Sequence, residues 1–232
     1  MAVSTPVTVY ALRKDGFTNE IDLILKDAPP GFAVTGSKVP ANQNQVRFTL
    51  TASPAAGGRP VPISLEGRAT IDGCEVLRPV VPAEDMMQAF AYRHLVPAKE
   101  LDVAVLGLGN GRFMGRSWVR VLGESPVRIP AGGTARVRLG TPTSAFAGRF
   151  DLELNDPPEG IAIDRVLPTD EGAEIVLKGD AAKLKPGLRG NLIVNLLAGR
   201  NMPAAQKGKK QGNQRRAMGT LPAIPFEVVA SP

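Results

Sequence analysis

The chain repeats itself at an offset of 129 residues, and this repeat constrains its fold more than any other feature. Residues 17–31 (FTNEIDLILKDAPPG) and 146–160 (FAGRFDLELNDPPEG) match without a gap and are identical at seven of fifteen positions. The same offset pairs Phe32 with Ile161, Val34 with Ile163, Val46 with Ile175 and Phe48 with Leu177. Because the register persists well beyond the matched segment, the sequence predicts a duplicated domain.

Each copy shows the two-residue period of a half-buried β-strand. In the first copy Ile21, Leu23 and Leu25 share one face, and in the second copy 150–154 alternates apolar with acidic residues. One face of such a strand packs on a core while the other meets water. Further candidate strands with the same period lie at 46–50, 61–65, 137–139 and 175–177. Gly and Pro-rich turn signals, among them Asp72-Gly73 and Pro30-Gly31, separate them at short intervals.

These observations predict an all-β protein made of two tandem immunoglobulin-like antiparallel β-sandwich domains, with a β-barrel as the alternative. The 25 Gly and 21 Pro leave little uninterrupted room for long helices. We expect the domains at 1–98 and 99–232, the second with a flexible basic loop at 199–220. The length of 232 residues accommodates two modest domains.

The connection between the copies has a different pattern. Residues 82–95 begin with Pro82, Glu84 and Asp85 and end with Arg93 and His94, the charge order of a short helix. Met86, Phe90 and His94 would then share a helix face. The same segment could instead form the closing strand of the first domain.

The second copy has more sequence before its repeated core than the first. Candidate strands at 101–106, 117–122 and 127–129 precede it, whereas subtraction of the offset would place the matching start of the first domain before Met1. A sandwich without its first strands leaves sheet edges uncovered. We therefore expect Met1 not to be the natural beginning and the chain to be a piece of a longer protein; the alternative is a shorter first domain.

The net charge of +6 is concentrated in the segment 199–220. Its cations are Arg200, Lys207, Lys209, Lys210, Arg215 and Arg216, and the rest of the chain carries no net charge. The segment has no aromatic residue and lies between the apolar candidate strands 192–197 and 221–229. This composition is typical of a solvated loop, with anion binding as the alternative, and we expect no nucleic-acid partner.

The inventory of catalytic groups is small. Cys74 is the only cysteine and His94 the only histidine, so an intrachain disulfide and a histidine-rich metal site are both excluded. We interpret Cys74 as a plain thiol and His94 as a packing residue. A small enzyme that uses His94 as an acid or base is the rival hypothesis.

Two other patterns resemble functional motifs only in part. The strand that leads into Gly107, Gly109 and Gly111 resembles a dinucleotide-binding turn, but Arg112 stands where the third glycine belongs, so we predict a glycine-rich hairpin. The acids Asp22 and Asp27, with Asp151 and Asp156 as their repeats, do not form a calcium loop and are expected to be outward strand and turn residues. The sequence thus predicts no enzyme, no cofactor and no metal.

Residues 1–12 do not show the basic region followed by an apolar core that is typical of a signal peptide, and no window is apolar and long enough for a membrane span. At 13–17 (RKDGF), 27–32 (DAPPGF) and 82–97, residues 3–105 resemble the large exported planctomycete-type proteins that carry pre-peptidase C-terminal-like domains. The resemblance implies immunoglobulin-like modules in a long extracytoplasmic chain, in the periplasm, at the cell surface or secreted.

We therefore expect non-catalytic structural or interaction modules of a longer extracytoplasmic protein. Their partners would be other domains of the parent chain, an envelope protein or a polysaccharide. The alternative is a carbohydrate- or protein-binding accessory module of a secreted hydrolase or peptidase. Trp118 is the only tryptophan, so an aromatic sugar platform is hard to assemble.

Overall fold

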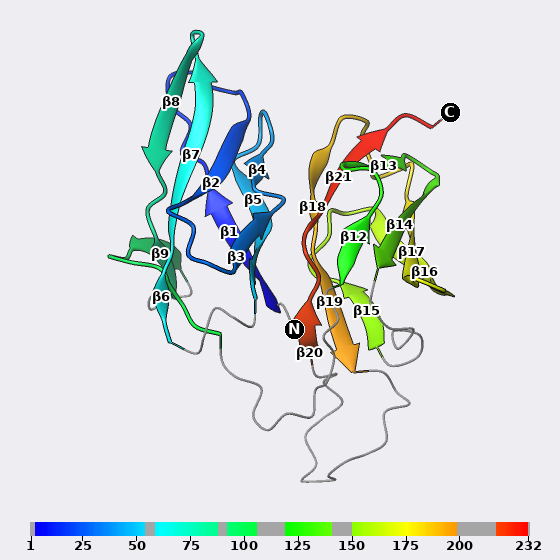
Figure 1. Ribbon diagram of the computed structural model, residues 1–232. Coiled ribbons are helices and arrows are strands. Elements are labelled where there is room, and N and C mark those ends of the chain that lie inside the picture. Colours follow the sequence, from blue (N-terminus) through cyan, green and yellow to red (C-terminus); the bar gives the residue numbers. More distant parts are fainter. Residues whose placement is uncertain are drawn as a thin grey trace.

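The computed structural model describes residues 3–53, 59–87, 92–105, 119–140, 150–198 and 217–231. These residues contain strands and no helix, so the predicted all-β class is confirmed. The strands form several sheets, and every pair is antiparallel except β13 with β21. In Figure 1 the strands of residues 3–105 (the first half) and of residues 119–231 (the second half) lie side by side.

The first half contains two facing sheets. One has the order β1-β5-β3 and the other the order β4-β2-β7-β8. Val9, Val46 and Phe48 of the first sheet meet Leu23, Val39 and Leu65 of the second in a buried core. The strands of this half are β1 (Val3–Tyr10), β2 (Ile21–Lys26), β3 (Phe32–Thr35), β4 (Lys38–Val39), β5 (Gln45–Ala52), β6 (Val61–Pro62), β7 (Ser64–Ile71), β8 (Cys74–Pro79), β9 (Ala83–Met87), β10 (Arg93–Pro97) and β11 (Asp102–Val103).

The second half has the larger core. The sheet β12-β14-β17-β16 contributes Val137, Leu139 and Ile175, which pack against Val194 and Phe226 from the opposite strands. Its strands are β12 (Arg120–Leu122), β13 (Val127–Pro130), β14 (Thr134–Gly140), β15 (Phe150–Leu154), β16 (Ile161–Thr169), β17 (Gly172–Gly179), β18 (Arg189–Leu192), β19 (Val194–Ala198), β20 (Ala217–Thr220) and β21 (Ile224–Val229).

Strand pairing reproduces the sequence repeat. Leu25 lies opposite Leu65 in the first half, and their counterparts Leu154 and Val194 lie opposite each other in the second. The turn after each of these strands is also the same: Asp27 and Asp156 have positive φ angles of 46° and 49°. The residue after the turn glycine makes the same hydrogen bond in both halves. The N–H of Phe32 donates to the carbonyl of Pro29, and the N–H of Ile161 donates to the carbonyl of Pro158, both at 3.1 Å.

The ungapped register does not extend to β5 and β17. Phe32 pairs with Ala52, whereas its counterpart Ile161 pairs with Gly179, so the structural offset between these strands is 127. The predicted pairing of Val46 with Ile175 and of Phe48 with Leu177 is therefore wrong by two residues, and Phe48 corresponds to Ile175. A shift by two keeps every side chain on its face of the sheet, which is why the apolar pattern concealed it.

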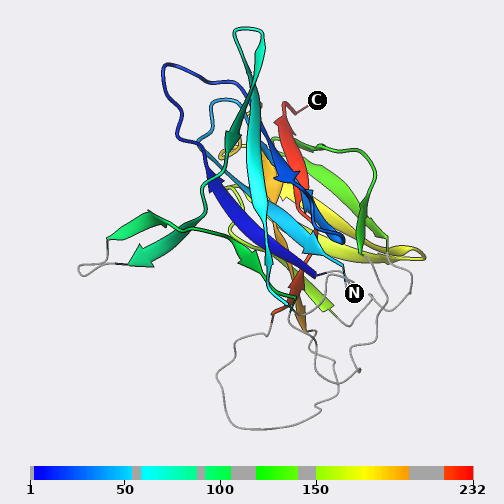
Figure 2. The same cartoon turned by 60° about the vertical axis from the view of Figure 1, so that its left-hand side comes forward.

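The predicted helix at 82–95 is wrong. Residues 83–87 and 93–97 form the hairpin β9–β10, in which His94 lies opposite Met86. Strand β9 follows β8 in the first half as β21 follows β20 in the second. Strand β21 buries Ile224, Phe226 and Val228, whereas β9 carries the exposed Glu84 and Asp85. A strand with two acids cannot fill a core position, and the hairpin leaves the body of the first half (Figure 2).

Strand β11 takes the place that β9 leaves open. It pairs with β6, as β21 pairs with β18 in the second half, and Leu101, Val103 and Val105 pack on Phe32, Leu50, Ala52 and Ile63. The candidate strand at 101–106, which we expected to open the second domain, therefore contributes to the core of the first half. The boundary at 98/99 stays a prediction.

Among the described residues, a single bridge joins the sheets of the two halves. Ser4 of β1 pairs with Thr220 of β20, which gives one six-stranded sheet with the order β15-β19-β20-β1-β5-β3. The predicted strand at 61–65 is broken at Ile63, whose N–H donates to the carbonyl of Leu101 at 2.8 Å. Of the other predicted strands, those at 21–25, 46–50, 127–129, 137–139, 150–154 and 175–177 are confirmed. The predicted strand at 192–197 is broken at Ile193, the one at 221–229 begins only at Ile224, and of the one at 117–122 the described residues 120–122 form β12.

Candidate functional site

The residues that sequence analysis singled out do not come together in one place. The six cations of the predicted anion-binding loop, Arg200, Lys207, Lys209, Lys210, Arg215 and Arg216, lie outside the described residues, as does the glycine-rich segment 107–112. His94 is exposed on β10 rather than packed in a core, so its predicted packing role is wrong. Cys74 is exposed at the two-residue turn between β7 and β8.

The acidic residues of the repeat have structural positions. Asp27 and Asp156 occupy the left-handed turn position that tolerates Asp and Asn. Asp22 is 3.3 Å from Lys38 Nζ and 3.8 Å from Arg68 Nη2. Among the described residues, no group of three or more His, Cys, Asp or Glu is placed to hold a metal ion.

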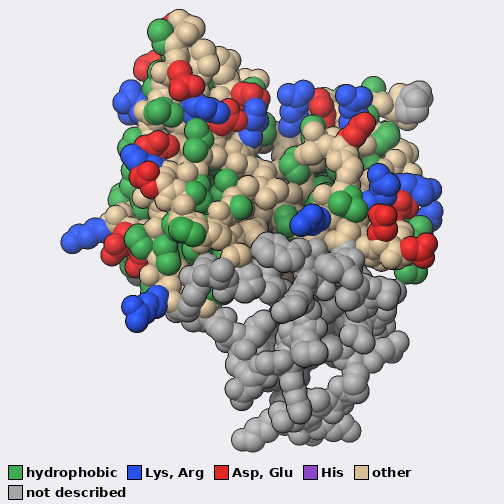
Figure 3. All heavy atoms as spheres, viewed as in Figure 1, with side chains coloured by type: hydrophobic (Ala, Val, Ile, Leu, Met, Phe, Trp, Pro, Cys, Tyr) green, Lys and Arg blue, Asp and Glu red, His purple; other side chains and the backbone are tan. Residues whose placement is uncertain are grey.

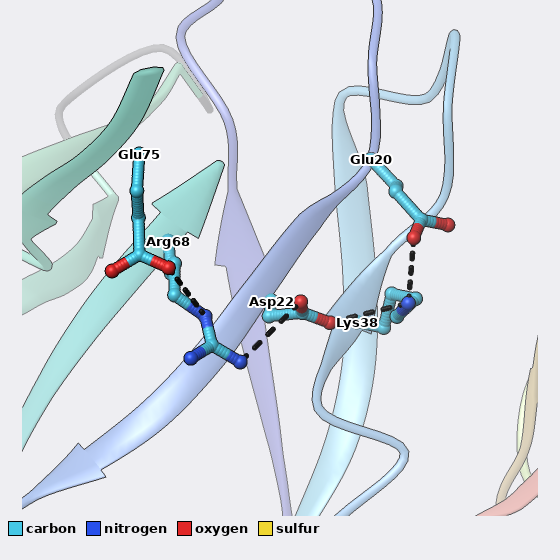
Figure 4. Close-up of polar contacts among 5 residues, drawn as sticks. All are labelled: Glu20, Asp22, Lys38, Arg68 and Glu75. Carbon is cyan, nitrogen blue, oxygen red and sulfur yellow. Dashed lines mark hydrogen bonds and ion pairs between the residues drawn. The ribbon is translucent and has the colours of Figure 1, made fainter. Parts of the chain in front are cut away.

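A row of alternating charges covers the outer face of the sheet β4-β2-β7-β8. Lys38 Nζ donates to Glu20 at 2.7 Å and lies beside Asp22, and Arg68 lies between Asp22 and Glu75 (Figure 4). The hydrogen bond to Glu20 is the main cause that raises the pKa of Lys38, against the smaller effect of burial. Each charge has an opposite neighbour, so this face presents little net charge to a ligand.

The two halves meet through polar side chains that the sequence repeat does not predict. Asn191 of β18 donates to the carbonyls of Gly36 at 2.7 Å and Arg47 at 2.8 Å. Arg47 of β5 in turn donates to the carbonyl and the side-chain oxygen of Asn155, at 3.0 and 2.9 Å. The N–H of Ala223 donates to the Oγ1 of Thr49, which is fully buried. We call these five residues, with Ala223, the interlock.

The backbone conformation at Gly36 makes room for the Asn191 side chain of the interlock. Gly36 has a φ of +73°, which L-residues with side chains rarely adopt, and a Cβ at this position would lie 2.6 Å from the Asn191 amide. Only glycine lets the Asn191 side chain reach the carbonyl of this turn. The sequence pattern singled out neither Gly36 nor its partner Asn191, which lies 155 residues further along the chain.

Arg13 joins loop segments of the first half by hydrogen bonds to their carbonyl groups. Its guanidinium donates to the carbonyls of Asn19, Pro40 and Gln43 at 2.6–3.0 Å and lies 5.3 Å from the centre of the Phe17 ring. The segment 13–17, which carries part of the family resemblance, therefore has a structural role in this chain.

The β9–β10 hairpin exposes apolar side chains. Met87 and Tyr92 are 66% and 68% exposed, and Met86, Leu95 and Val96 are each at least 40% exposed. An isolated two-stranded hairpin is marginally stable in water, so the hairpin is suited to contact with another surface.

Comparison of the sequence with models of known protein families and with curated proteins gives no match. Among the described residues, no helix is long and apolar enough to cross a membrane.

Proposed function

We propose that the chain is a tandem pair of immunoglobulin-like β-sandwich modules that acts as a spacer or interaction unit of a longer extracytoplasmic protein, without a catalytic step. The observation that carries this proposal is the interlock. Thr49, Arg47 and Asn191 join the halves by hydrogen bonds that depend on one relative orientation. A pair held in this way can set the distance between whatever lies at its two ends.

The immunoglobulin-like part of the proposal rests on strand order. Both halves contain a three-strand sheet, β1-β5-β3 or β14-β17-β16, opposite a second set, β2-β7-β8 or β15-β19-β20. In the second half β13 also pairs parallel with the final strand β21. The extracytoplasmic location rests on the resemblance of residues 3–105 to exported planctomycete-type proteins.

The experiment is detection of the native protein in its own cells with an antibody to the second half. A mass well above 24.5 kDa, together with digestion by protease added to intact or osmotically opened cells, supports the proposal. A species of 24.5 kDa confined to the cytoplasm contradicts it.

A protein-binding accessory module is the second candidate, and the exposed apolar hairpin β9–β10 favours it. The His94 enzyme remains the third hypothesis, and unchanged activity of His94→Ala in any assay where the protein works would exclude it. For the carbohydrate-binding version, a glycan array without a ligand at high protein concentration would count against it.

A further inference from the structure

The outer face of the sheet β12-β14-β17-β16 collects cations that are scattered in the sequence. Arg120, Arg136, Arg138, Arg165 and Lys178 all project from this face and are exposed. We call them the arginine face. In the space-filling view, Lys and Arg side chains gather over β14, β16 and β17, with a few acids among them (Figure 3).

Most of this charge is uncompensated. Glu174 binds Arg136 at 3.0 Å and Asp164 binds Arg165 at 3.0 Å. Within the described part of the chain, Arg120, Arg138 and Lys178 have no carboxylate partner. This sheet therefore lacks the complete pairing of charges found on the outer face of the sheet β4-β2-β7-β8.

A hollow lies at one edge of the arginine face. Arg128 of β13 and Arg136 and Arg138 of β14 line it, together with Glu124. Three guanidinium groups around one depression can donate several hydrogen bonds to a planar or tetrahedral anionic group.

The equivalent face of the first half is already occupied. There Arg47 and Thr49 bind the second half through the interlock. At the offset of 127 these residues correspond to Glu174 and Val176. Val176 cannot accept the hydrogen bond that Thr49 accepts, and Glu174 is held by Arg136. The arginine face is therefore not built to receive another repeat by the same contacts.

The spacing of the cations indicates a chain-like ligand. Residues two apart on a strand lie about 7 Å apart on one face, and neighbouring strands lie about 5 Å apart. Arg138 and Arg136 on β14, with Arg165 on β16 and Lys178 on β17, thus form a flat array of positive charges at short intervals. No aromatic side chain lies among these residues for a base to stack on, which disfavours nucleic acid.

We propose that the arginine face binds an acidic polysaccharide, with its carboxylate or sulfate groups in the hollow lined by Arg128, Arg136 and Arg138. The proposal rests on the proposed role as interaction modules and names their ligand. It differs from the predicted anion-binding loop, because all its residues lie on strands of the sandwich.

The test uses the full chain and compares two triple variants of equal charge. The face variant is Arg128→Gln with Arg138→Gln and Lys178→Gln, which leaves no acid unpaired. The matched control is Arg78→Gln with Lys99→Gln and Lys185→Gln, three exposed cations elsewhere. Both are also made in a chain whose six loop cations at 200–216 are changed to Gln, so that the loop does not mask the effect.

Calorimetric titrations use heparin fragments, polygalacturonate, neutral dextran and a short duplex DNA. We expect binding of a sulfated or carboxylated polysaccharide that the face variant weakens by roughly tenfold, because charge-assisted contacts are lost, while the control stays near the unmodified chain. Heparin and polygalacturonate distinguish sulfate from carboxylate as the recognised group.

Three results would overturn the proposal: no binding of either acidic polymer at low ionic strength, equal weakening by the control, or tighter face-dependent binding of duplex DNA. A self-association that the face variant abolishes would assign the face to a second copy and also overturn it. None of these results depends on the size or location of the native protein, so failure here is distinct from failure of the proposed function.

Discussion

At the scale of single residues, the structure depends on a few polar groups between the halves. Thr49 has no exposed surface and accepts the N–H of Ala223 at 2.8 Å. Thr49→Val keeps the shape and leaves that buried N–H without a partner. We expect a loss of about 2 kcal/mol in the free energy of unfolding, measured with urea. Thr70→Val, on the exposed strand β7, is the control and should change it little; equal losses would contradict the role of Thr49.

Gly36 is the second critical residue. Gly36→Ala places a Cβ 2.6 Å from the Asn191 side chain, at a φ of +73°. Steric conflict and backbone strain together should destabilise the protein by about 2 kcal/mol or more. Gly16→Ala has a similar φ of +76° with nothing within 4 Å of the added Cβ, so it isolates the backbone contribution. The expected order of thermal midpoints is unmodified chain, Gly16→Ala, then Gly36→Ala.

Lys38 gives a prediction with a pH dependence. Its hydrogen bond to Glu20 raises its pKa in the folded state above the usual 10.5. A raised lysine pKa stabilises the folded state fully below the unfolded value, and this stabilisation is lost as the pH rises through the folded value. Because the pair is half exposed, Lys38→Gln should cost only about 0.5 kcal/mol at neutral pH. The difference in urea stability between the two proteins should shrink above the lysine pKa; a difference that grows there would contradict us.

At the scale of elements, the hairpin β9–β10 is separable from the fold. The N–H of Ala98 donates to the carbonyl of Pro82 at 2.8 Å, so the two ends of the hairpin meet. Replacement of 83–97 by Gly-Gly should leave the thermal midpoint nearly unchanged, because β11 closes the core. Val103→Asp, in β11, should instead destabilise the first half, since Val103 packs on the core that contains Phe32 and Leu50. The reverse order of the two midpoints would show that β9–β10 contributes to the core.

The strands that sequence analysis found were those with strict alternation on one face. In the segments 21–25 and 150–154 apolar residues recur at every second position, and the repeat shows the same two-residue period in both copies. Strand β1 is not among the predicted strands, because Pro6 lies inside it and proline is disfavoured in the interior of a strand. The helix prediction at 82–95 relied on charge order at its ends, which an exposed hairpin with acids in one strand and basic residues in the other shares.

The arginine face and the interlock could not be predicted from the sequence, because their residues are far apart in the chain. Arg136 and Arg138 are neighbours in the chain, but Arg120, Arg165 and Lys178 join them only through the pairing of four strands. Asn191 and Gly36 are likewise far apart in the sequence and meet only in the folded chain. Long-range pairing determines both, and it cannot be read from local periodicity.

At the scale of the whole molecule, we expect the interlock to hold the two halves in one orientation. The chain offers a direct probe, because Cys74 is its only cysteine and is exposed at the β7–β8 turn. Glu171→Cys adds a second exposed site at the β16–β17 turn of the other half.

The measurement is the distribution of distances between spin labels at Cys74 and at Glu171→Cys, determined by pulsed electron paramagnetic resonance. We predict one narrow distribution, which broadens when Thr49→Val, Arg47→Ala and Asn191→Ala together remove the hydrogen bonds of the interlock. A broad or multiple distribution in the chain with the interlock intact would contradict the claim that these contacts fix the halves, and with it the proposed spacer role.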